Sequence, residues 1–140
     1  LSARAVIRQV PELLPMLEVG ARAYGWTWGR PVLVHQCRVG VMNDIGDAIR
    51  PEVLVLLVGE RPGLATAESL SAYMAFRPRA GHTDADRNLV SNIHANGVPV
   101  ADAARRVLAW AERMMVLKLS GVAVKETAWP GGPLFLNETT

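Results

Sequence analysis

The feature that most constrains the fold is an unbroken apolar run at residues 53–58 (VLVLLV), which leads directly into a turn at residues 59–64 (GERPGL). A run without polar alternation is typical of a strand buried on both faces, so it predicts a central strand of a parallel sheet. Ligands of open α/β sheets bind in the crevice beyond the carboxyl ends of the strands. Residues 59–64 are therefore expected to line a ligand site.

The chemistry of this turn suits a ligand, but it also suits an ordinary reversal of the chain. Glu60 offers an acceptor, Arg61 a fork of donors, Pro62 stiffens the loop, and Gly63 lets the backbone come close to a ligand. A plain strand-ending turn explains the same residues, because Pro before Gly is good turn chemistry. Residue types alone leave both interpretations open.

The remaining pattern alternates helices and short apolar strands. Pro11 and Pro15 fall inside the first helical pattern and predict a break near Val10. The order is helix, strand, helix, strand, short helix, strand, long helix, strand, which predicts an α/β fold with a Rossmann-like, mostly parallel sheet flanked by helices. The expected helices cover residues 3–21, 41–49, 66–69, 83–86 and 99–119, and the expected strands include 32–34, 53–58, 73–76 and 122–124.

Composition excludes several classes of protein. The 140 residues suit one domain, and the net charge of +2 comes from basic residues that form no stripe, which argues against a nucleic-acid partner. No apolar run reaches membrane length, so no membrane association is expected. Cys37 is the single cysteine, which favours a cytoplasmic location. The chain opens at Leu1, and we expect it to be the remainder of a longer one.

Known catalytic fingerprints are missing from the sequence. It has no Gly-x-Gly-x-x-Gly, no Gly-Lys-Ser/Thr phosphate loop and no Gly-x-Ser-x-Gly, so a dehydrogenase, an NTPase and a serine hydrolase are unsupported. His35 and Cys37 are too few to bind zinc, and no metal site is predicted. Ser91 and Asn92 carry small polar side chains suited to amide or hydroxyl ligands, although such pairs also cap or turn the backbone.

Four blocks of sequence carry a resemblance to a known family. They are VGERPGL at 58–64, SLSAY at 69–73, DADRN at 84–88 and SNIH at 91–94. In this order and spacing they resemble the small (light) subunit of ethanolamine ammonia-lyase. The resemblance runs from Leu1 to the SGV at 120–122 and corresponds to the family's carboxyl-terminal, cobalamin-contacting domain. It implies one domain at residues 1–125, a tail at 126–140, and the absence of the family's amino-terminal region.

The resemblance also implies a function. The chain would be part of a carbon–nitrogen lyase that converts ethanolamine to acetaldehyde and ammonia, and it would be inactive in isolation. It would hold adenosylcobalamin at the interface with a larger catalytic subunit, in a hetero-oligomer. The radical chemistry would belong to the cofactor and the large subunit, so no catalytic residue is expected in this chain. The location would be cytoplasmic, with association with a bacterial microcompartment as a further expectation.

Individual cofactor contacts follow from the same resemblance. Val39 and Glu60 match family positions that contact cobalamin, and a third such position falls on Leu89, where some members have Cys. Backbone groups of Gly63 and Leu64 would serve other amides of the corrin. The loop VHQCRVG at 34–40 lacks the Asp-x-His-x-x-Gly pattern, so base-on binding without a protein ligand to cobalt is expected. The alternatives are a stand-alone corrinoid- or nucleotide-binding module without catalysis.

Overall fold

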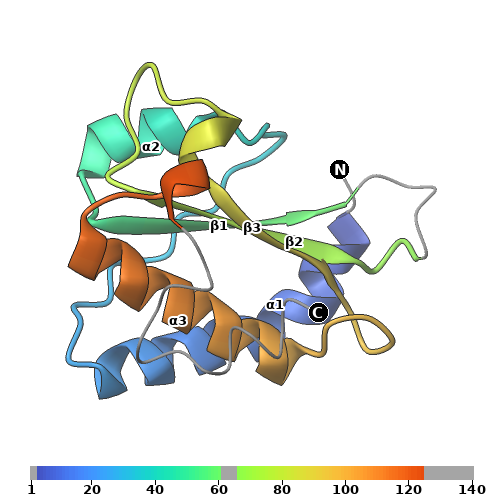
Figure 1. The fold of residues 1–140 in the computed structure, drawn as a ribbon. Helices are drawn as coiled ribbons and strands as arrows, with labels where there is room; N and C mark the ends of the chain where they lie inside the picture. The colour runs from blue at the N-terminus through green and yellow to red at the C-terminus, as the bar shows by residue number, and fades with distance from the viewer. Residues whose placement is uncertain (1–2, 61–65, 125–140) are drawn as a thin grey trace.

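The computed structural model describes residues 3–60 and 66–124 and arranges them in layers around one small sheet (Figure 1). Helices α1 (Ala3–Ala23) and α3 (Val100–Leu117) lie side by side beneath one face of the sheet. The short helix α2 (Val41–Ile49) lies over part of the opposite face. That opposite face is therefore only partly covered by helix.

The sheet is antiparallel, and the expectation of a Rossmann-like parallel sheet is wrong. Its strands are β1 (Val53–Gly59), β2 (Leu70–Phe76) and β3 (Asn88–Ile93), in the order β1-β2-β3. Both neighbouring pairs are antiparallel. Each strand runs back along the one before it, and such a pair needs no crossover helix. Within residues 3–60 and 66–124, three α-helices and three strands form a different architecture from a doubly wound α/β fold.

The apolar run that suggested a central strand forms an edge strand. Strand β2 lies in the middle of the three, and all but one of its residues are buried, whereas most of β1 is half-buried. Helix α1 contacts β1 from one face and α2 contacts it from the other. Helices on both faces explain an unbroken apolar run without a parallel neighbour.

Helix α1 is continuous, so the predicted break near Val10 is wrong. Its buried positions recur every four residues on the side that packs against α3 and the sheet, and Pro11 and Pro15 lie on the exposed side. Each proline removes one helical hydrogen bond, but on the exposed side water can reach the carbonyl group that loses its donor. Tertiary packing therefore maintains the helix. The buried positions are Ala5, Gln9, Leu13, Leu17 and Ala21.

Three smaller predicted elements are also wrong. Residues 32–34 form no strand, and Leu33 is 93% exposed. Residues 66–69 form a turn instead of a helix, and residues 121–123 form the 3₁₀ turn η2 (Gly121–Ala123) instead of a final strand. A strand needs a neighbour to pair with, and short apolar triplets do not reveal whether one exists. The 3₁₀ turn η1 (Asp84–Asp86), by contrast, agrees with the predicted helical turn.

The two faces of the sheet have different roles. Leu57, Ala72 and Val90 form one cross-strand row in the hydrophobic core against α1 and α3. The neighbouring row, Leu56, Tyr73 and Leu89, faces the other way because side chains alternate along a strand. Leu89 remains 46% exposed. The face opposite α1 and α3 thus combines apolar side chains with open surface.

Candidate functional site

Glu60 binds three donors at one end of the sheet. Its Oε1 accepts a hydrogen bond from Ser69 Oγ at 2.7 Å, and its Oε2 accepts from Ser71 Oγ at 2.9 Å and from the backbone N–H of Asn92 at 2.6 Å. We call Glu60, Ser69, Ser71 and Asn92 the Glu60 cluster. A carboxylate has about four acceptor sites, so Oε1 retains capacity for one further donor.

Antiparallel pairing brings these residues together. Gly59, which ends β1, pairs with Leu70, and Leu70 pairs in turn with Ile93 at the end of β3. The carboxyl ends of β1 and β3 therefore meet the beginning of β2. A β-bulge between Leu70 and Ala72 shifts the register there. The bulge places a backbone N–H of β3 within reach of Glu60.

Glu60 is held as a carboxylate. Burial alone would raise its pKa, but the N–H of Asn92, the hydroxyls of Ser69 and Ser71 and the charge of His94 outweigh burial, so the pKa lies below its ordinary value of 4.5. At neutral pH the cluster therefore presents a negative charge that is partly neutralised by fixed donors.

A polar hollow lies beside the Glu60 cluster. It has a volume of about 390 Å³ and is lined by side chains that carry amide, imidazole, hydroxyl and carboxylate groups. Two of the lining residues lie at the end of β3: Asn92 is the last residue but one of the strand, and His94 is the first residue after it. The hollow can accept a neutral polar group of a ligand or partner. Its lining residues are Thr66, Glu68, Asn92, His94, Ala95 and Asn96.

The structure brings some of the predicted site residues together. Glu60 and Asn92 are hydrogen-bonded, and Ser91 is exposed next to Asn92. Leu89 lies on β3 three residues before Asn92, and its side chain is on the partly covered face of the sheet. Val39 lies two residues before α2, the helix on that same face. Arg61, Pro62, Gly63 and Leu64 lie outside the described residues.

Sequence reasoning missed the two serines that donate to Glu60, and it missed His94 beside them. Ser69, Ser71 and His94 stand inside the blocks SLSAY and SNIH, which were interpreted only as carriers of the resemblance. The recurrence of serine at positions 69 and 71 was the available signal. In a strand this spacing puts both hydroxyls on one face.

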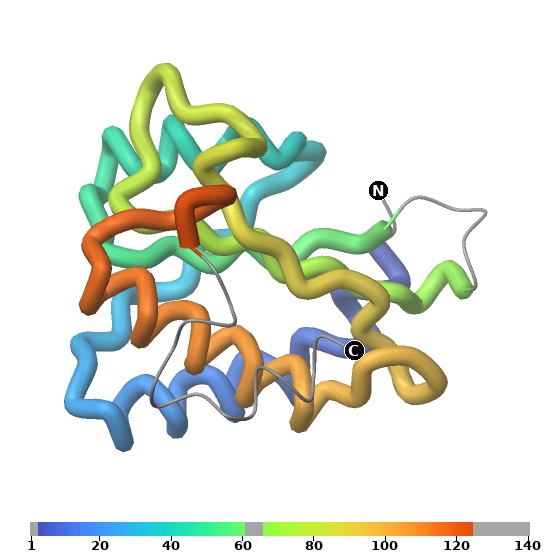
Figure 2. The backbone as a smooth tube through the Cα atoms, in the orientation of Figure 1, coloured from blue at the N-terminus to red at the C-terminus, as the bar shows by residue number. Residues whose placement is uncertain are grey.

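The opposite end of β3 carries a second polar cluster. Asn88 Oδ1 accepts from the backbone N–H of Gly121 at 2.6 Å, and Asn88 Nδ2 donates to the carbonyl of Gly121 at 3.2 Å. Ser120 Oγ donates to the carbonyl of Asp86 at 2.6 Å and accepts from the N–H of Phe76 at 2.8 Å. We call Asn88, Asp86, Ser120 and Gly121 the Asn88 cluster. It joins the blocks DADRN and SGV, whose segments lie side by side in Figure 2.

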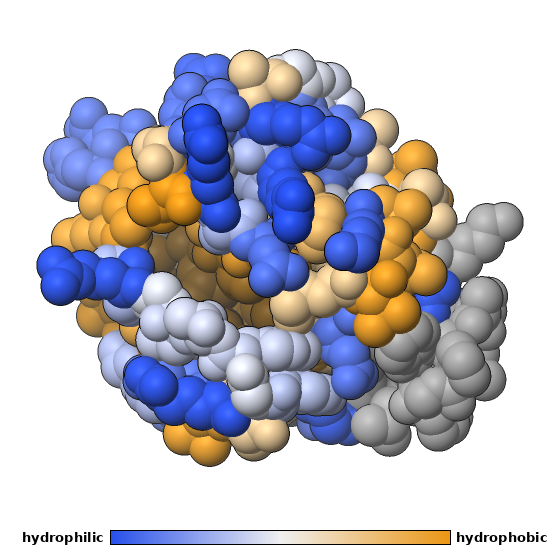
Figure 3. Space-filling view, turned by 90° about the vertical axis from the view of Figure 1, so that its left-hand side faces the viewer, coloured by the Kyte–Doolittle hydropathy of each residue, from blue (hydrophilic) through white to orange (hydrophobic). Residues whose placement is uncertain are grey.

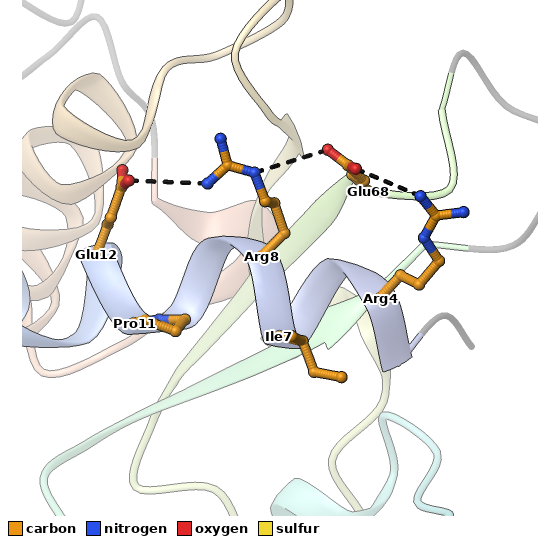
Figure 4. A pocket seen from close by; sticks show the side chains of 6 residues that line it. All are labelled: Arg4, Ile7, Arg8, Pro11, Glu12 and Glu68. Carbon is orange, nitrogen blue, oxygen red and sulfur yellow. Dashed lines mark ion pairs between the residues drawn. The ribbon is translucent and has the colours of Figure 1, made fainter.

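Another depression lies on the outer side of α1 (Figure 4). Its volume is about 380 Å³, and a chain of exposed ion pairs crosses it: Arg4 with Glu68 at 3.5 Å, Glu68 with Arg8 at 3.9 Å, and Arg8 with Glu12 at 3.8 Å. Charges of opposite sign alternate, so the depression has no strong net charge. Exposed pairs of this kind add little to stability or to binding.

The described residues form a hollow on one side of the molecule and bring no cluster of metal ligands together. The side of the molecule seen in Figure 3 has a hollow with hydrophobic side chains at its floor and a rim of both hydrophobic and hydrophilic side chains. Within residues 3–60 and 66–124, no three His, Cys, Asp or Glu side chains come together as a metal site. No helix in the same residues is long and apolar enough to cross a membrane.

Comparison with known proteins identifies relatives of the whole described region. The family described as ethanolamine ammonia-lyase light chain (EutC) matches residues 1–125. The ethanolamine ammonia-lyase small subunit of Clostridium perfringens is 41% identical over 125 residues, which are 89% of this chain and 42% of that protein. The small subunit of Listeria innocua is 38% identical over 125 residues, 89% of this chain and 43% of that protein.

A third relative gives the same picture. The ethanolamine ammonia-lyase small subunit of Pseudomonas aeruginosa is 43% identical over 128 residues, which are 91% of this chain and 47% of that protein. The chain thus spans less than half the length of the curated relatives it matches.

Proposed function

Since this chain belongs to the ethanolamine ammonia-lyase light-chain family, we propose that it helps bind adenosylcobalamin at an interface with a larger catalytic subunit. In this proposal the assembled enzyme converts ethanolamine to acetaldehyde and ammonia. The observation that carries it is the Glu60 cluster, an ionised acceptor held at the margin of a partly covered sheet face. The chain itself supplies binding and orientation, and no catalytic residue.

The residues present fit the proposed cofactor. Cobalamin has a broad apolar macrocycle whose rim carries neutral amides. Leu89, nearly half exposed, offers apolar surface on the partly covered sheet face, and Val39 precedes the helix on that face. The remaining acceptor site on Glu60 suits one amide N–H, and the amides of Asn92 and Asn96 in the adjacent hollow can both donate and accept. When bound, the cofactor supplies the radical that starts the reaction.

Base-on binding, without a protein ligand to cobalt from this chain, remains part of the proposal. The histidine nearest the Glu60 cluster is His94, which is only 8% exposed. Both of its ring nitrogens have partners, Asn92 Oδ1 at 2.8 Å and the N–H of Asn96 at 3.3 Å. A histidine engaged in this way supports a site that leaves the cofactor's own base on the metal. Cytoplasmic location and microcompartment association stay predictions.

Reconstitution tests the proposal. The chain is mixed with the large subunit of ethanolamine ammonia-lyase and adenosylcobalamin, and ammonia release from ethanolamine is compared with release by either chain alone. We expect association on size-exclusion chromatography, and ammonia release only from the complete mixture. Failure of the two chains to associate, or ammonia release by this chain alone, would contradict the proposal.

Two matched variants sharpen the test. Glu60→Gln keeps the shape of the side chain but removes its charge, so the adenosylcobalamin concentration for half-maximal activity should rise about tenfold, as for loss of one charged hydrogen bond. Glu12→Gln removes a carboxylate in the exposed ion-pair chain of α1 and should leave that concentration unchanged. Equal behaviour of the two variants would remove Glu60 from the cofactor site.

A further inference from the structure

The N–H that Asn92 offers to Glu60 depends on an unusual backbone conformation. Asn92 has φ of 61°, in the left-handed region, whereas the residues of a regular strand are extended. Asn tolerates this region better than most residues, but at a cost relative to the extended form. Something nearby must therefore favour the left-handed conformation at the end of β3.

The imidazole of His94 contacts the side-chain amide of Asn92. Its Nε2 lies 2.8 Å from Asn92 Oδ1, and its Nδ1 accepts from the backbone N–H of Asn96 at 3.3 Å. An Nδ1 that accepts carries no proton when the ring is neutral, so the proton is on Nε2 and points to Asn92 Oδ1. The hydrogen-bonding pattern thus determines both the tautomer and the direction of donation.

The turn that contains these residues is closed tightly around them. The N–H of Val98 donates to the carbonyl of Asn92 at 2.8 Å, and the N–H of His94 donates to the carbonyl of Val98 at 3.1 Å. A Cβ on Gly97 would contact the carbonyl oxygen of Asn92 and would come within 2.7 Å of His94 Nε2. A side chain at position 97 would therefore force the Asn92 carbonyl, the Asn92 amide and the imidazole apart, and glycine avoids this.

We propose that His94 is a positioning residue for Glu60: it holds the side chain of Asn92, and thereby the left-handed backbone whose N–H reaches the Glu60 carboxylate. The hydrogen bonds run from the N–H of Asn96 to His94, from His94 to Asn92, and from Asn92 to Glu60. His94 does not touch Glu60 in this arrangement. It acts on the carboxylate through the conformation of one residue.

The direct test follows the Asn92 amide in the isolated chain by hydrogen exchange and NMR at neutral pH. His94→Ala should speed exchange of this amide about tenfold, because the conformation that protects it is no longer held. His94→Gln keeps a donor for Asn92 Oδ1 and should stay within about twofold of the parent. His35→Gln, at an exposed histidine, should change nothing.

A carboxyl titration separates positioning from simple charge. The acidic groups that face His94 are Glu60 and, across the polar hollow, Glu68. His94→Ala should raise the pKa of Glu60, and neutral His94→Gln should restore most of the low value if hydrogen bonding through Asn92 is the cause. A shift in His94→Gln equal to that in His94→Ala would mean that only the charge of His94 matters, and would overturn the proposal.

A second variant removes the Asn92 side chain that links His94 to Glu60 and leaves the imidazole in place. Asn92→Gly accepts the left-handed conformation but has no side chain for His94 to hold. If His94 acts through that side chain, adding His94→Ala to Asn92→Gly should produce no further change in exchange at residue 92. Additive effects of the two substitutions on this exchange would show that His94 acts on the residue 92 amide by another route and would overturn the proposal.

A last experiment, on cofactor affinity, rests on the proposed function. Its outcome can be distinguished from the outcome of the amide-exchange and titration experiments. In the reconstituted enzyme His94→Ala should raise the half-saturating adenosylcobalamin concentration, and His94→Gln should restore it. An unchanged amide in His94→Ala ends the positioning role whatever the enzyme does. A changed amide with unchanged cofactor affinity keeps the positioning role and removes Glu60 from the cofactor site.

Discussion

The two ends of β3 are held by different kinds of polar contact. At the start of the strand, Asn88 joins both backbone groups of Gly121 through a neutral amide. At the end of the strand, Asn92 gives its N–H to the charged, half-buried Glu60. The strength of this neutral pair of hydrogen bonds does not depend on pH, and the pair ties η2 to the start of β3. A half-buried carboxylate keeps an acceptor site near the surface, which is what a ligand-binding group needs.

The largest expected effect is at the Asn88 cluster. Gly121 has φ of +89°, and a Cβ there would contact the carbonyl oxygen of Ala85 and come within 2.6 Å of Asp86 Cα. Gly121→Ala should therefore lower the free energy of unfolding by about 3 kcal/mol or more. Gly81→Ala is the matched control, because Gly81 has φ of +94° but open space around it. It should cost only about 1 kcal/mol, and urea denaturation measures both.

Removal of the Asn88 side chain should have the next largest effect. Asn88→Ala leaves the N–H and carbonyl of Gly121 without these partners, so stability should fall by about 2 kcal/mol. The loss should be the same at pH 4 and pH 7, because no ionised group takes part in the pair. A clear pH dependence in the denaturation difference would contradict the distinction between the two ends of β3.

Glu60→Gln should cost less at neutral pH and should change the pH dependence of stability. The variant weakens three hydrogen bonds, at a net cost of about 1 kcal/mol for this half-buried group. Because folding lowers the pKa of Glu60 below 4.5, its contribution is complete above that pH and is lost as pH falls through the lowered value. The parent and Glu60→Gln should therefore converge in stability as the pH is lowered from 7 to 3 in denaturation experiments.

The smallest expected effect is on the outer side of α1. Glu12→Gln breaks the exposed pair with Arg8, whose two side chains are 59% and 57% exposed. Stability should change by no more than about 0.5 kcal/mol, and high salt should abolish the difference. A larger loss would mean that the ion-pair chain stabilises the helix as much as either end of β3 does.

Local pattern predicted the elements better than their arrangement. Helices α2 and α3 and the strand at residues 73–76 are present because amphipathic spacing and β-branched or aromatic content act locally. The direction of β2 relative to β1 depends on how the chain reverses between them, and apolar content carries no record of direction. The two prolines of α1 were misread because burial on the far side of the helix compensates for them.

The candidate site follows the same division. Glu60 and Asn92 were selected from their residue types, but the bond between them requires the register shift between β2 and β3, with its extra residue in β3, and the left-handed conformation of Asn92. Ser69 and Ser71 can be recognised as hydrogen-bond donors to Glu60 only when β2 is known to pair with β1. Contacts between strands therefore could not be predicted from the pattern within each segment.

The edge position of β1 has a consequence for handling the protein. No strand among residues 3–60 and 66–124 pairs with its outer side, although its residues Val53–Val58 are all aliphatic. A partly unfolded chain that loses α1 or α2 would also expose the aliphatic faces of this unpaired strand to another copy, and strand addition between copies leads to aggregation. Refolding yield should consequently decline as the concentration of the chain is raised, and charged substitutions at the rim would be the remedy.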